Sequence, residues 1–196
     1  MTRIADCAEV LPGYALKARA EHEPEGSFQV IMARHLSDCM PYRYVSDHEL
    51  RMTPKGKAEK YRVLVGDVLF ISRGTRNCAA VVESVPEDTV ASATFYILRP
   101  TAQVDPGYLA WCLNQPPVQA QISQVRTGAG TPIVQRSVFA DIVIPFPPMI
   151  EQKRLAGLGE LMRKEQELRK RLVDATETYH KAIGTKLISQ LSKTYN

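Results

Sequence analysis

The stretch IVIPFPPMIEQKRLAGLGELMRKEQELRKRLVDATETYHKAI, residues 142–183, divides this sequence into two parts. It begins with a short apolar run and three prolines, and no proline follows Pro148. Proline is tolerated at the first turn of a helix, where the backbone N–H has no helical partner. From Met149 onward the composition is highly charged, and Gly184 is suited to the position just after a helix end. The sequence therefore predicts one long helix over residues 148–184, preceded by a compact domain.

Apolar residues in the predicted helix recur at alternating intervals of three and four, which is the heptad spacing of a coiled coil. Glu165 is the one polar interruption. A helix with a single narrow apolar stripe is stabilised when a second helix covers that stripe. We therefore expect a homodimer whose two helices pack antiparallel. The predicted dimerisation residues are Leu158, Leu161, Leu168, Leu172, Ala175 and Tyr179.

Composition places the chain among folded soluble proteins, with 44% apolar and 23% charged residues. No apolar run reaches the length of a membrane span, and the N-terminus lacks the apolar core of a signal peptide, so we expect a cytoplasmic protein. His35, Cys39 and His48 lie near enough in sequence to suggest a metal site. Zinc requires a fourth ligand and closer spacing, so neither a metal nor a cofactor is expected.

The formal net charge of +4 lies entirely in the helical part. Residues 1–149 carry 15 basic and 15 acidic groups, whereas residues 150–196 carry 10 basic and 6 acidic groups. Within the neutral domain, RMTPKGKAEKYR (51–62) holds five basic groups against one acid, and Arg73 and Arg76 follow. Such a stripe suits a polyanion bound on one face, although a solvated loop rich in lysine has the same composition.

A glycine-rich segment, Thr127 to Thr131, lies late in the domain. Its two glycines allow backbone N–H groups to approach an anion, and its threonine hydroxyls can donate to phosphate oxygens. It lacks the Gly-Lys-Ser/Thr of a P-loop, and an ordinary connecting loop fits the pattern equally well.

Two enzyme-like patterns do not lead to an active site. Asp141, Glu151 and Lys153 have a spacing found in nucleases, but the prolines place the last two on a helix instead of a strand. FPPM (146–149) resembles the catalytic loop of amino-methyltransferases, except that phenylalanine occupies the position of the required polar residue. We therefore expect a protein that is not itself an enzyme.

Two segments carry a family resemblance. GDVLFISRGTRN (66–77) and GAGTPIVQRSVFADIVIPFPPMIEQKRLAGL (128–158) resemble target-recognition domains of type I restriction-modification specificity (S) subunits. The second segment resembles the end of such a domain and the start of its spacer helix. An S subunit carries two recognition domains and two spacer helices, whereas this chain resembles one half of that arrangement.

The resemblance implies an α/β fold: a mixed-sheet target-recognition domain, 1–147, followed by a long coiled-coil-forming spacer helix, 148–184, and a short tail, 185–196. The implied function is sequence-specific binding of double-stranded DNA at a bipartite target. The implied partners are a DNA methyltransferase subunit and, in some systems, a restriction subunit. The alternative is a coiled-coil adaptor or structural protein that binds an acidic protein.

We assign DNA contacts to basic residues and to the glycine-rich loop. Arg73, Arg76 and the loop of residues 40–52 are expected to read bases, since arginine can form two hydrogen bonds to guanine. The predicted DNA-binding residues are Arg43, Arg51, Lys55, Lys57, Lys60, Arg62, Arg73, Arg76, Thr127, Gly128, Gly130, Thr131 and Arg136.

Overall fold

The structure, a computed structural model, describes residues 1–16, 21–36, 43–46, 48–54 and 56–194. By its internal contacts the chain forms two units, Met1–Gly159 and Glu160–Asn196, called here the domain unit and the helical unit. The 46-residue helix α5 (Met149–Thr194) contributes its first three turns to the domain unit and the rest to the helical unit.

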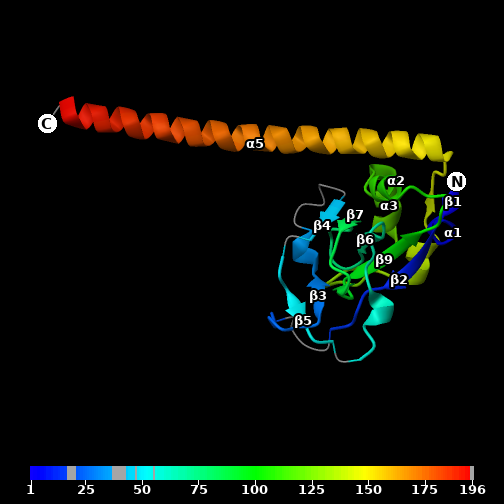
Figure 1. The fold of residues 1–196 in the computed structure, drawn as a ribbon. Coiled ribbons are helices and arrows are strands. Elements are labelled where there is room, and N and C mark those ends of the chain that lie inside the picture. Colours follow the sequence, from blue (N-terminus) through cyan, green and yellow to red (C-terminus); the bar gives the residue numbers. More distant parts are fainter. Residues whose placement is uncertain (17–20, 37–42, 47, 55, 195–196) are drawn as a thin grey trace. The chain divides into compact units, whose positions relative to one another are not determined.

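The largest sheet of the domain unit has five strands in the order β2-β9-β6-β7-β4 (Figure 1). Neighbouring strands are antiparallel except for β4 and β7, which are parallel. The bounds are β2 (Ala8–Pro12), β4 (Arg43–Val45), β6 (Val68–Ile71), β7 (Ala79–Ser84) and β9 (Phe95–Pro100).

A second, three-stranded sheet has the order β5-β3-β8, with β3 and β8 parallel. Its strands are β3 (Phe28–Ile31), β5 (Arg51–Met52) and β8 (Thr89–Ala91). Two short antiparallel pairs complete the strands. They are β1 (Thr2–Arg3) with β12 (Val143–Ile144), and β10 (Arg126–Thr127) with β11 (Ile133–Val134).

Strand β6 explains how the layers of the domain unit are arranged. All four of its residues are buried, and successive side chains of a strand point to opposite faces. Val68 and Phe70 join the cluster that includes residues of helices α2 and α3, whereas Leu69 and Ile71 join the cluster on the other face. The five-stranded sheet is therefore covered on both faces, and Figure 1 shows α2 and α3 beside one of them.

In its described residues the domain unit contains four short α-helices and two 3-10 turns besides the start of α5. Prolines at the first turns of α2 and α3 suit those positions, and Asp105 caps α2 by accepting the Tyr108 N–H at 2.8 Å. The elements are α1 (Ile4–Cys7), α2 (Pro106–Leu113), α3 (Pro116–Gln124), α4 (Arg136–Ala140), η1 (Ala33–His35) and η2 (Glu59–Tyr61).

These mixed sheets and the long C-terminal helix confirm the predicted fold class. The predicted end of the helix at Gly184 is wrong, because residues 185–194 continue α5 and do not form a separate tail. A glycine that ends a helix adopts a positive φ, and Gly184 does not. Helix-favouring lysine and leucine residues follow it, and one interior glycine costs only about 1 kcal/mol. The division at residues 147 and 148 stays a prediction.

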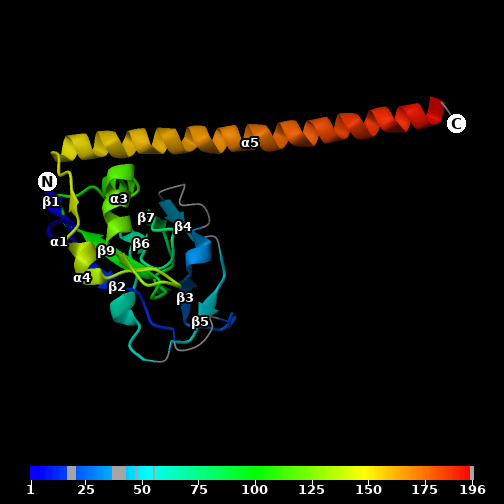
Figure 2. The same cartoon turned by 180° about the vertical axis from the view of Figure 1, so that it is seen from behind.

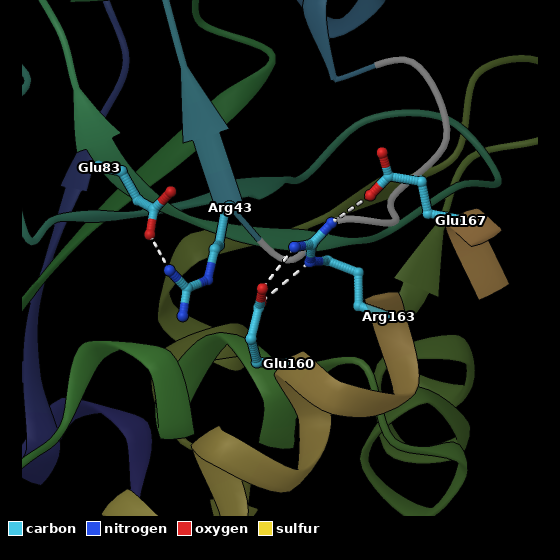
Figure 3. Close-up of polar contacts among 5 residues, drawn as sticks. All are labelled: Arg43, Glu83, Glu160, Arg163 and Glu167. Carbon is cyan, nitrogen blue, oxygen red and sulfur yellow. Dashed lines mark hydrogen bonds and ion pairs between the residues drawn. The ribbon is translucent and has the colours of Figure 1, made fainter. Parts of the chain in front are cut away.

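The helical unit is stabilised along its surface by ion pairs one turn apart. Arg163 lies between Glu160 and Glu167, and its Nη1 is 3.0 Å from the Glu167 carboxylate (Figure 3). Glu165, the polar interruption of the apolar stripe, pairs with Arg169 at 2.6 Å. Each such pair contributes about 0.2–0.5 kcal/mol to a helix.

The predicted dimerisation residues lie exposed on α5. Leu161 is 66% exposed and Leu172 is 68% exposed, and Leu158, Leu168 and Tyr179 are also exposed. Coiled-coil pairing stays a prediction. Among the residues that the structure describes, no helix is both long enough and apolar enough to cross a membrane.

Candidate nucleic-acid interface

The turn that follows β6 lies against the hairpin formed by β10 and β11. The Gly74 N–H donates to the Pro132 carbonyl at 2.7 Å, and the Val134 N–H donates to the Ser72 carbonyl at 3.0 Å. Arg73 and Ile133 form an isolated antiparallel bridge between these hydrogen bonds. The structure thus joins two segments that are separated by about 50 residues in the sequence, Arg73–Asn77 and Arg126–Val134, called here the turn–hairpin surface.

Local sequence explains both loops of this surface. Gly74 has φ +90° and Gly128 has φ +103°, a left-handed conformation that residues with a Cβ adopt only with strain. Asn77 closes the turn because its buried side-chain amide donates to the Ile71 carbonyl at 2.9 Å. The backbone of the Arg73 turn is therefore fixed by contacts that do not involve the Arg73 side chain.

Tyr96 supports the hairpin from the sheet below it. Its hydroxyl donates to the Val134 carbonyl at 2.6 Å. Burial raises the pKa of Tyr96, while the positive charges of Arg136 and Arg73 act in the opposite direction. Arg136 follows Val134 by two residues, which places it beside the turn–hairpin surface.

The cations on and beside this surface differ in their internal hydrogen bonds. Arg73 is exposed, and within the described part of the chain its side chain forms no hydrogen bond or ion pair. Arg76 donates to the Leu36 carbonyl at 2.6 Å. Arg136 donates to the Val10 carbonyl at 3.2 Å. It also lines a cavity of about 310 Å³ beside α4 and β2, and Figure 2 shows these two elements from behind. Arg73 is thus free to contact a ligand without giving up an internal bond.

Arg126 is a member of this surface that the sequence did not reveal. Its guanidinium donates to the Thr75 carbonyl at 3.0 Å and to the Ser123 hydroxyl at 2.9 Å, joining the turn, the hairpin and the end of α3. The predicted loop begins at Thr127, one residue later. The spacing of three residues between Ser123 and Arg126 was a local signal for a contact between these two side chains. The contact of Arg126 with Thr75 joins residues that are distant in sequence, so no local pattern indicated it.

The basic stripe of residues 51–62 lies elsewhere, on the three-stranded sheet and η2, and its two arginines are already engaged. Arg51 donates to the carbonyls of Gly26 and Ser27 at 2.7 and 3.1 Å. Arg62 pairs with Asp88 at 2.6 Å and lies over the Phe28 ring. These two arginines stabilise the domain through their internal contacts.

The remaining predicted basic residues vary in their surroundings. Lys60 lies over the ring of Tyr61, with 5.0 Å from Nζ to the ring centroid, and Lys57 is exposed. Arg43, on the edge strand β4, forms an ion pair with Glu83 (Figure 3). Lys55 lies outside the described residues.

An ion pair between a buried carboxylate and a partly exposed arginine, next to the stripe, was also missed by sequence reasoning. Asp67 is 2% exposed, accepts the Leu64 N–H at 2.8 Å and binds Arg99 through both carboxylate oxygens. Its hydrogen bond raises the pKa of Arg99. Arg99 also donates to the Arg62 carbonyl, so this pair holds the start of β6 against the stripe.

Two histidines of the metal site considered above do lie together. The rings of His35 and His48 are 3.5 Å apart between centroids, and the Tyr44 hydroxyl is 2.8 Å from Nε2 of His48. Cys39 lies outside the described residues. Across the described ranges, no group of three or more His, Cys, Asp and Glu side chains is placed to hold a metal ion.

No protein-family model and no curated protein matches the sequence. Solved structures do match the fold. The S subunit of a type I restriction-modification system from M. genitalium has a TM-score of 0.57 at 14% identity over 85% of this chain. The HsdS subunit from Thermoanaerobacter tengcongensis has a TM-score of 0.58 at 16% identity over 87% of this chain.

A third structure, which concerns assembly and conformational transition of the type I R-M system, has a TM-score of 0.68 at 15% identity over 93% of this chain. This chain spans about two fifths of the matched chains, between 38% and 42% of their lengths. The likeness confirms that the fold is that of part of an S subunit.

Proposed function

We propose that this chain is a DNA-recognition subunit of a type I-like restriction-modification system, in which it binds a specific DNA sequence. The observation that carries the proposal is the match of domain and helix together to S-subunit structures, over 85–93% of the chain. A fold does not determine a function, so the chemistry of the surface has to agree with it.

The turn–hairpin surface supplies that agreement. Arg73 is exposed on a backbone that internal hydrogen bonds already fix, and an arginine so placed can form two hydrogen bonds to guanine. The Thr127 and Thr131 hydroxyls and the exposed glycine backbone suit phosphate oxygens. We infer that Arg73 reads a base and that the hairpin loop, Lys57 and Lys60 contact phosphates.

The chain acts by directing other subunits. A separate methyltransferase subunit carries out DNA modification, and a restriction subunit, where the system has one, carries out cleavage. This chain recognises the target sequence and contributes no catalytic group or cofactor.

The active form in this proposal is a homodimer. The exposed apolar stripe of α5 would be covered by the same stripe of a second copy, and burial of each leucine is worth about 1.5–3 kcal/mol. Closed two-fold pairing of antiparallel helices provides two recognition domains in place of the two found in one S subunit. Two-fold symmetry makes the target bipartite, with two inverted half-sites.

Salt dependence of DNA binding tests the function. Affinity of the purified chain for a random duplex is measured at salt concentrations from 50 to 200 mM. Several phosphate contacts would lower the affinity steeply with salt, because each contact releases counterions. A flat response, together with binding to an acidic protein, would favour the adaptor function instead.

Light scattering tests the dimer. The full chain should have about twice the mass of 21.9 kDa. The double change Leu168→Glu and Leu172→Glu places charge in the stripe and should give monomers. Val173→Glu is the matched control, because Val173 is exposed but lies outside the stripe. A wild-type monomer would contradict the homodimer.

A further inference from the structure

Gln152 is a buried polar side chain at the start of the long helix. It is 1% exposed, and its Oε1 accepts the Asp105 N–H at 2.9 Å. Its Nε2 donates to the carbonyls of Gln103 and Pro147 at 3.1 and 2.9 Å. The side-chain amide thus uses its acceptor and both donors, and it joins α5 to the segment before α2 and to the chain before α5.

A close packing contact lies two turns further along the same helix. A Cβ added at Gly159 would be 2.3 Å from Cδ1 of Trp111, a distance that real Cβ atoms do not show. A Cβ added at Gly157 would meet nothing within 4 Å. The two glycines therefore have different roles: Gly159 permits contact with α2, whereas Gly157 is not required by the domain unit.

The residues that contact the domain share one face of α5. Gln152, Ala156 and Gly159 are spaced four and three apart, as neighbours on one helical face are. At 3.6 residues per turn, Leu161, Leu168 and Leu172 lie on the opposite side, about 180° away. The helix therefore uses separate faces for attachment to its domain and for the proposed pairing.

We propose that Gln152 is a positioning residue which, with the contact between Trp111 and Gly159, fixes the first three turns of α5 in the domain and thereby sets which separation of two half-sites the protein recognises. This inference rests on the proposed function. Without the Gln152 amide, one N–H and two carbonyl groups lose a partner at a partly buried position. The first turns of α5 would then be held less firmly, while the strands of the core keep their own contacts.

Two pairs of variants of the full-length protein test the proposal. Gln152→Ala is compared with Gln166→Ala, since Gln166 is exposed on the same helix. Gly159→Ala is compared with Gly157→Ala, since both changes favour helix formation but only the first meets Trp111. Hydrogen exchange of residues 149–159 gives a measurement that requires no DNA. Gln152→Ala and Gly159→Ala should lower protection there at least about tenfold, and both controls should retain it.

The second measurement is the preference for half-site separation, using duplexes in which the two half-sites are moved apart one base pair at a time. Wild type and controls should show one optimum. Gln152→Ala and Gly159→Ala should bind several separations within about threefold of each other and keep wild-type affinity for a single half-site. A general loss of stability would instead weaken binding to every duplex equally.

The two possible failures are distinguishable. A wild-type protein that binds no duplex overturns the proposed function, and the wild-type measurement alone detects this. A wild-type protein with one optimum and a Gln152→Ala protein that keeps the same sharp optimum, or the same exchange protection, overturns the role of Gln152.

Discussion

The stripe of residues 51–62 and the turn–hairpin surface look alike in the sequence, because both combine arginine or lysine with turn residues. In the structure Arg73 of the turn–hairpin surface differs from the two arginines of the stripe. Arg51 and Arg62 bind carbonyl and carboxylate oxygens of their own domain, whereas the exposed side chain of Arg73 has no such bond within the described ranges. The number of cations in a segment therefore does not measure how many can meet a ligand. The contacts of each one have to be known.

The largest expected effect is a loss of stability at the ion pair of Asp67, next to the stripe. Asp67→Ala should lower the free energy of unfolding by about 3 kcal/mol, because it leaves Arg99 and the Leu64 N–H without their buried partner. Urea unfolding measures the loss, and Glu87→Ala, at an exposed turn, is the control. A loss no larger than that of the control would show that the ion pair beside the stripe is not structural.

The next effect concerns Arg73 and the specificity of DNA binding. Arg73→Ala should weaken binding to the preferred sequence by about 1–3 kcal/mol and relax specificity at one position, without changing unfolding. Arg51→Ala should do the reverse, with a loss of about 1 kcal/mol in stability and little change in specificity. Anisotropy titrations on matched and mismatched duplexes measure both. Equal weakening toward all sequences would identify Arg73 as a phosphate contact.

The smallest effect tests whether any cation of the stripe reaches DNA. Lys57→Ala should reduce the slope of log affinity against log salt by about 0.9, the value for one phosphate contact on duplex DNA. Its affinity should fall by the same factor on every sequence. An unchanged slope would place Lys57 on a face that only solvent contacts and would contradict its proposed phosphate contact.

Local patterns predicted the parts of the molecule that depend on neighbouring residues. The prolines before Met149, for example, predicted the start of α5. The glycine-rich loop was also identified from the sequence. Its position next to the Arg73 turn depends on tertiary contacts, which the sequence does not indicate.

Residues whose partners are distant in sequence could not be identified in this way. Gln152 is one polar residue among many in a charged helix, and its partners at 103 and 105 follow from the packing of α2 on α5. Arg126 meets Thr75 for the same kind of reason. Gly159 resembles Gly157 in sequence, and only the position of Trp111 distinguishes their structural roles.

Selection of bound duplexes from a random-sequence pool, followed by sequencing, shows whether this chain recognises a specific DNA sequence. We expect enrichment of two inverted half-sites with an unread spacer, and loss of one base preference in each half-site for Arg73→Ala. A wild-type pool that stays as random as the input would contradict sequence recognition by this chain.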